Sequence, residues 1–121
     1  MFAVKVFIFS PVQENTYILY NERKDCIIID PGCYYDDEKD ALAFFVENNG
    51  LTPRLLLNTH CHLDHVFGNK WVSEKYGLIL HLHDKEKIVL DNAPVAGLRW
   101  NLPFDNYQGD VQYVREGDII S

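Results

Sequence analysis

Four potential metal ligands lie within six consecutive positions of this chain, at His60, His62, Asp64 and His65. Imidazole and carboxylate groups suit zinc or another divalent transition metal. Two histidines separated by one residue can converge on one ion only where the backbone is extended or looped, because a helix would splay them apart. Asp64 and His65 come after a further bend and can face a second point in space. The spacing therefore favours two metal positions and, with them, hydrolysis by a metal-activated water.

The density of ligands is what makes this cluster specific. The chain has five histidines in 121 residues, and three of them fall in this short stretch beside an aspartate. The competing interpretation is a polar loop whose charges only cap the helix that follows. His81 and His83, which alternate on an apolar stretch, are interpreted as surface or packing residues. Cys61, between two of the ligands, is interpreted as a buried thiol that points away from them.

Composition and charge exclude several classes of function. With 47% hydrophobic and 13% aromatic residues, residues 1–121 are expected to form one globular domain. No apolar run approaches the roughly 20 residues that span a bilayer, and the N-terminus lacks a secretory pattern, so a cytoplasmic location is expected. The formal charge of −7 gives no attraction to phosphate backbones or anionic lipid, so we expect neither a nucleic-acid partner nor a membrane partner. Three irregularly spaced cysteines fit a reduced compartment.

Several strands and one helix must position the cluster. Apolar or alternating runs predict strands over Val4–Phe9, Thr16–Tyr20 and Cys26–Ile29, the last of them buried on both faces. Acidic residues followed by an apolar stripe predict a helix from about Asp36 to Asn48. A strand from Arg54 to Asn58 then delivers the cluster at its C-terminal end.

The second half of the chain is less regular. Helical spacing after the cluster ends at Gly77, and a short strand over Leu78–Leu82 follows. A short helix over Asp84–Leu90 is predicted, and residues 91–108, with two prolines and no steady period, predict a long loop. A strand over 111–114, a turn over 115–118 and the opening of another strand at 119–120 complete the predicted elements.

The motif also supports a resemblance. The order Thr-His-x-His-x-Asp-His after a hydrophobic strand, at Thr59–His65, is similar to the signature of the metallo-β-lactamase superfamily. Further likeness, at Glu14–Tyr17, Ile29–Gly32 and Gly68–Asn69, is to the N-terminal half of glyoxalase II-like hydrolases. The resemblance covers nearly the whole chain.

This resemblance implies a fold and a site. The fold is α+β, the N-terminal half of the αββα sandwich, with a mostly antiparallel sheet and helices on one face. His60 and His62 would hold the first metal, Asp64 and His65 the second, and Asp30 would support the site from behind. Zinc is the expected metal, as two ions in the full-length protein, with iron or manganese as alternatives.

Members of the superfamily complete their site with a further His, a bridging Asp and a last His from a C-terminal half. No histidine follows His83 here. The resemblance therefore implies that the chain is truncated before that half and that the 121 residues alone are inactive. A lone half would expose an apolar sheet face, so we expect a homo-oligomer formed through that face.

Three functions follow as hypotheses. The first is a zinc-dependent hydrolase of thioesters, such as acyl-glutathione, or of related esters, in which a metal-bound hydroxide attacks and Asp64 orients or deprotonates it. The second is an iron-dependent persulfide dioxygenase, because similar ligands on this fold can hold one iron. The third is a metal-binding or association fragment without catalysis.

Overall fold

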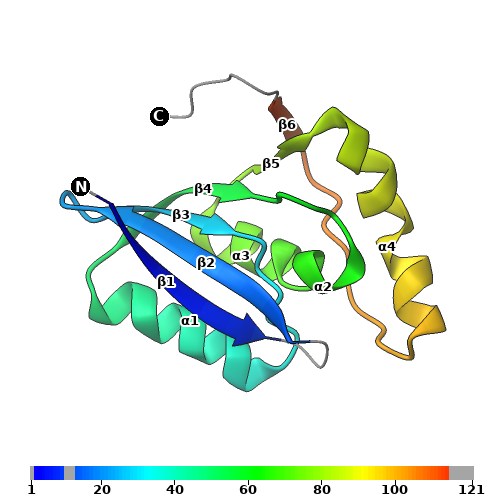
Figure 1. Ribbon diagram of the computed structural model, residues 1–121, viewed down its shortest axis with the longest axis horizontal. Coiled ribbons are helices and arrows are strands. Elements are labelled where there is room, and N and C mark those ends of the chain that lie inside the picture. Colours follow the sequence, from blue (N-terminus) through cyan, green and yellow to red (C-terminus); the bar gives the residue numbers. More distant parts are fainter. Residues whose placement is uncertain (1, 10–12, 115–121) are drawn as a thin grey trace.

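A six-stranded sheet forms the centre of the fold in the computed structural model, which describes residues 2–9 and 13–114 (Figure 1). The predicted turn at 115–118 and strand at 119–120 lie outside these residues. In chain order the elements are β1 (Phe2–Phe9), β2 (Glu14–Asn21), β3 (Asp25–Ile29), α1 (Asp36–Asn48), β4 (Thr52–Leu57), α2 (Leu63–Val66), α3 (Asn69–Tyr76), β5 (Leu80–His83), the 3-10 helix η1 (Asp84–Glu86), α4 (Lys87–Arg99) and β6 (Val111–Val114).

The strands follow one another across the sheet in the order β1 to β6. β1, β2 and β3 pair antiparallel, whereas β3, β4, β5 and β6 pair parallel. The expected α+β class is confirmed, but the sheet is mixed rather than mostly antiparallel. The reason is that helices connect the strands after β3, and a helical crossover returns the next strand in the same direction.

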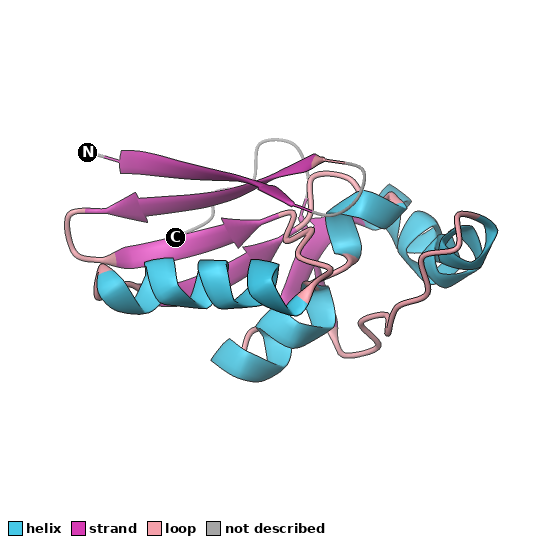
Figure 2. Cartoon of the chain, turned by 90° about the horizontal axis from the view of Figure 1, so that it is seen from below, coloured by secondary structure: helices cyan, strands magenta, loops and turns pink. Residues whose placement is uncertain are grey.

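α1 and α3 lie on one face of the sheet, as expected, whereas α2 and α4 lie at the end of the sheet (Figure 2). α1 begins and ends at the predicted residues, and its acidic first turn includes Glu38, whose carboxylate accepts the backbone N–H groups of Tyr34 and Tyr35. α3 ends at Gly77, which has a left-handed backbone with φ +66°. Fully buried side chains from both layers form the core, among them Ile18, Ile28, Leu42, Leu56, Val72 and Leu80.

The other face of the sheet is apolar and open. On β1 the outward side chains Phe2, Val4, Val6 and Ile8 are all exposed. β3 is buried on one face only, because Cys26 and Ile28 are buried while Ile27 and Ile29 are half-buried. The prediction of a strand buried on both faces was therefore wrong for these residues, since nothing in the described chain covers the outer face.

The predicted loop over 91–108 is largely wrong, because α4 continues to Arg99 with Pro94 inside it. A proline has no N–H, so it leaves the carbonyl four residues earlier without its helical donor. That carbonyl belongs to Leu90, and the side-chain amide of Asn106 donates to it at 2.8 Å. A residue from the following loop thus replaces the hydrogen bond that proline removes, and the helix continues. No described helix has the length and hydropathy required to cross a membrane.

The open face gives the first testable prediction. We expect the 121-residue chain to self-associate through the outer side of β1, because burying apolar surface is favourable. The double variant Val4→Lys, Ile8→Lys should shift the population towards monomer in light scattering across a concentration series. Phe44→Lys is the matched control, since Phe44 is 67% exposed but lies on α1. A wild-type monomer at the highest concentration would contradict this prediction.

Candidate metal centre

The candidate ligands lie on the loop that follows β4 and on the short helix α2. The ring centroids of His60 and His62 are 6.2 Å apart, and those of His60 and His65 are 5.7 Å apart. The backbone at His62 is extended, with φ −63° and ψ 155°, and α2 begins at the next residue. Asp64 Oδ2 lies 3.7 Å from His65 Nε2. The structure therefore brings the three imidazoles and the carboxylate into one region.

Asp30 joins this loop to the end of β3. It is buried and has a left-handed backbone with φ +51°, which is uncommon outside glycine and tolerated best by aspartate and asparagine. Its carboxylate accepts the backbone N–H of Thr59 at 2.7 Å and also the hydroxyl of Thr59. The same carboxylate lies 3.1 Å from His65 Nδ1. Asp30 thus contacts both the loop and one of the candidate ligands.

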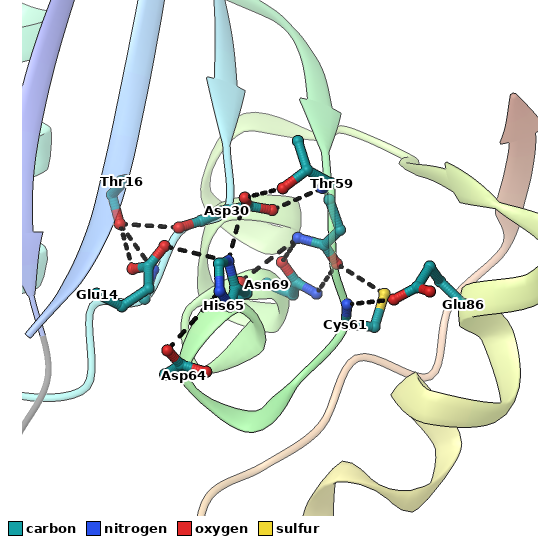
Figure 3. A network of polar contacts seen from close by, with 11 residues as sticks. Glu14, Thr16, Asp30, Thr59, Cys61, Asp64, His65, Asn69 and Glu86 are labelled. Carbon is teal, nitrogen blue, oxygen red and sulfur yellow. Dashed lines mark hydrogen bonds and ion pairs between the residues drawn. The ribbon is translucent and has the colours of Figure 1, made fainter. Parts of the chain in front are cut away.

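His65 consequently presents its two ring nitrogens to opposite environments (Figure 3). Nδ1 faces the buried carboxylate of Asp30, and Nε2 faces Asp64. Hydrogen bonding to Asp30 raises the pKa of His65 above its ordinary value of 6.5, because together with the negative charge of Asp30 it outweighs the effect of burial. A metal-binding histidine is usually held by a carboxylate in this way on its second nitrogen.

Glu14 and Thr16 were not among the predicted site residues. Both are buried on the inward face of β2, and Glu14 Oε1 lies 3.5 Å from His65 Nδ1. Thr16 Oγ1 lies 3.0 Å from Glu14 Oε2, contacts the carbonyl of Asp30 at 2.8 Å, and accepts the N–H of Gly32. Burial, together with the nearby negative charges of Asp30 and Asp64, raises the pKa of Glu14 to about 9. A carboxylate at an inward strand position was the available sequence signal.

The types of side chain present fit a divalent metal on the Nε2 side of the His65 ring. In the described chain, the only three metal-binding atoms found within 4.8 Å of one another belong to Glu14, Asp30 and His65. That group uses the buried nitrogen of His65, and Asp30 is already engaged by Thr59. The nitrogen left for a metal is Nε2, which lies beside Asp64, while the rings of His60 and His62 lie farther away in the same region. The assignment of these four residues to two metals remains a prediction.

A pair of buried amides fixes the shape of the loop. Asn58 and Asn69 exchange hydrogen bonds of 3.1 and 2.7 Å through their side chains, and Asn58 Nδ2 lies 3.5 Å from the carbonyl of His65. Asn58 also donates its backbone N–H to His81 on β5 at 2.9 Å. The pair ties the end of β4 to the start of α3, on either side of the candidate ligands. No sequence period marks such a pair.

Cys61 points into the protein rather than towards the ligands. It is fully buried, its Sγ lies 3.6 Å from Asn58 Oδ1, and burial raises the pKa of its thiol to about 12. A neutral, buried thiol is a poor metal ligand. Its backbone N–H donates to Glu86 Oε1 at 2.9 Å, so Glu86, at the end of η1, holds the loop from the side of α4.

His81 and His83 make local contacts on and after β5. His81 Nδ1 lies 3.0 Å from the carbonyl of Ile79, and His83 Nδ1 lies 3.1 Å from Asp84. His83 Nδ1 also accepts the N–H of Lys85. These contacts suit surface histidines.

The amide pair gives a second prediction. Replacing Asn58 by Leu leaves the buried amide of Asn69 unpaired, and we expect the free energy of unfolding to fall by about 1–3 kcal/mol. The double variant Asn58→Leu, Asn69→Leu should lose less than the sum of the two single variants, because the two residues share one interaction. Urea unfolding measures both effects. Asn92→Leu, on the exposed side of α4, is the control, and additive losses would refute the coupling.

Glu14 gives a third prediction, for protein stripped of metal by a chelator. Its pKa is about 9 in the fold and near 4.5 when unfolded, so the folded state holds the proton more tightly. Stability from this group is complete below pH 4.5 and is lost as the pH rises towards 9, with a slope that approaches about 1.4 kcal/mol per pH unit. Glu14→Gln should remove that slope. Parallel stability profiles for the two proteins between pH 5.5 and 8 would contradict this account.

Comparison with known proteins agrees with this geometry. The family model described as the metallo-beta-lactamase superfamily matches residues 9–120. The hydroxyacylglutathione hydrolase GloC of Haemophilus influenzae is 29% identical over 97% of this chain and 54% of its own length. The probable metallo-hydrolase YqgX of Bacillus subtilis is 36% identical over 73% of this chain and 39% of its own. The chain thus spans about half the length of these relatives or less.

Solved structures show the same likeness. The B3 metallo-beta-lactamase BLEG-1 superposes with a TM-score of 0.82 at 29% identity, over 98% of this chain and 56% of that one. TTHA1623, in a di-iron-bound form, superposes with a TM-score of 0.82 at 28% identity, over 96% of this chain and 56% of that one. With its histidine cluster on the loop after β4 and a family match over nearly its whole length, the chain belongs to the metallo-β-lactamase superfamily.

Proposed function

We propose that the protein containing this chain is a metal-dependent hydrolase of thioesters or related esters, of the glyoxalase II type. The observation that carries the proposal is the gathering of three imidazoles and Asp64, with His65 held from behind by Asp30. The relative from Haemophilus influenzae, which is named a hydroxyacylglutathione hydrolase, supports this class of substrate. Zinc is the proposed metal.

The described residues divide the work of such a site. His60 and His62 would hold the first ion, and Asp64 and His65 the second. Divalent ions bound there would activate a water and polarise the substrate carbonyl. Asp64 is half-buried beside the open face of His65, where its carboxylate would orient the attacking water or take its proton.

The state of the cysteines supports a reducing compartment. Cys26, Cys33 and Cys61 are all free and buried. Cytosolic proteins keep thiols reduced, whereas small secreted proteins generally pair them. We therefore propose a cytoplasmic location.

An iron-dependent persulfide dioxygenase is the second candidate. The di-iron-bound form of TTHA1623, at 28% identity, is the observation that favours iron. Metal analysis of the protein as the cell makes it, combined with oxygen uptake on a persulfide, separates this candidate from the hydrolase. Thioester hydrolysis by the 121-residue chain alone tests the third candidate, a non-catalytic fragment, and we expect little or none.

Substitution of one ligand tests the main proposal. In the protein as the cell makes it, His60→Ala should lower thioester hydrolysis more than about 100-fold, beyond the 10–100-fold typical of residues that only support a ligand. Bound metal, measured by elemental analysis, should fall with it. His81→Ala is the matched control, because His81 lies on β5 outside the cluster and should leave both values unchanged. Hydrolysis retained by His60→Ala would exclude the proposed mechanism.

A further inference from the structure

Glu14 is the acidic side chain that approaches His65 from β2 (Figure 3). Its Oε1 lies 3.5 Å from His65 Nδ1, while Asp30 Oδ2 lies 3.1 Å from the same nitrogen. The two carboxylates therefore share one ring nitrogen. Either oxygen can accept the Nδ1 proton, and with that proton fixed on Nδ1 the lone pair of Nε2 is free to bind a metal.

The two carboxylates differ in their other contacts. Asp30 accepts two hydrogen bonds from Thr59, so it also fixes the start of the loop that carries His60 and His62. Glu14 instead contacts Thr16, on its own strand, and within the described residues it makes no hydrogen bond to the loop that carries His60 and His62. Its influence on the candidate ligands therefore passes through His65 and the start of α2.

The space around Gly32 shows how closely Glu14 fits against α2. A Cβ at Gly32 would collide with the Glu14 carboxyl group and lie 2.5 Å from the carbonyl oxygen of Asp64. The Glu14 carboxyl group and the Asp64 backbone thus both pack closely against Gly32. Thr16 fixes that space from the other side, because its hydroxyl accepts the N–H of Gly32 at 2.9 Å. The carboxyl group of Glu14 therefore packs between the turn after β3 and the helix α2, which carries Asp64 and His65.

We propose that Glu14 is a positioning residue which fixes the ring of His65 and the backbone at Asp64, and thereby determines filling of the second metal position but not the first. This inference rests on the proposed pairing of Asp64 with His65 on the second ion. It adds to the proposed function a residue with a selective effect. Loss of Glu14 weakens metal binding at the second position only, whereas loss of Asp30 weakens binding at both positions.

Zinc titration of the protein as the cell makes it tests this selectivity. Glu14→Met keeps the volume and removes the acceptor, and we expect the second equivalent of zinc to bind at least about 10-fold more weakly while the first is unchanged. Glu14→Gln keeps an oxygen that can face Nδ1 and should bind both equivalents with affinities close to those of the wild type. Asn15→Ala is the matched control, because Asn15 is the next residue on β2 and its exposed side chain lies on the opposite face.

Two results would overturn the proposal: wild-type affinity for both equivalents in Glu14→Met, or equal weakening of both. A second measurement does not depend on the folding of that variant. In ¹⁵N NMR of the chelator-treated protein, at a pH high enough for the ring to be neutral, His65 should carry its single proton on Nδ1 in the wild type and in Glu14→Gln. A neutral ring protonated on Nε2 in either protein would also overturn the proposal. Neither measurement involves turnover, so a protein that binds two metals but hydrolyses no thioester would refute the proposed function and leave this inference standing.

Discussion

The carboxylate of Asp30 is the interaction on which the candidate site depends. It lies at the end of β3, accepts two hydrogen bonds from Thr59 at the start of the histidine loop, and contacts His65 on α2. Three segments that are separate in sequence therefore meet at one side chain. The left-handed backbone at Asp30 is the cost of this placement, and its N–H, donated to Leu57 on β4, helps hold it there.

The direction of the strands explains why these segments meet. β3 and β4 run parallel, so the residues that follow them, Asp30 and Asn58, emerge at the same edge. In mixed and parallel sheets this edge is where polar side chains can converge without interrupting the core. The antiparallel pairing of β2 with β3 then brings the first residues of β2 to the same edge, which is why Glu14 and Thr16 lie there. The site is thus built from the ends of three neighbouring strands and one short helix.

Much of this arrangement could be predicted from local sequence. The histidine motif predicted the superfamily, which the family match confirms, and the acidic start and apolar stripe of α1 gave its bounds. What could not be predicted depends on contacts between distant residues. The continuation of α4 past Pro94 depends on Asn106, and the role of Asn58 in holding the loop depends on Asn69. Neither pairing has a period or a spacing that a sequence pattern could reveal. Glu14 was part of the stretch that carried the resemblance, but its place beside His65 required the fold.

The bond from Asn106 to the carbonyl of Leu90 has a consequence for how this region can change in evolution. The proline and the asparagine lie in different elements, yet they act on one carbonyl: Pro94 removes its helical donor, and the half-buried Asn106 supplies another. Substitutions at the two positions should therefore occur together among relatives. We therefore expect α4 and the loop that carries Asn106 to be replaced together during evolution rather than one at a time.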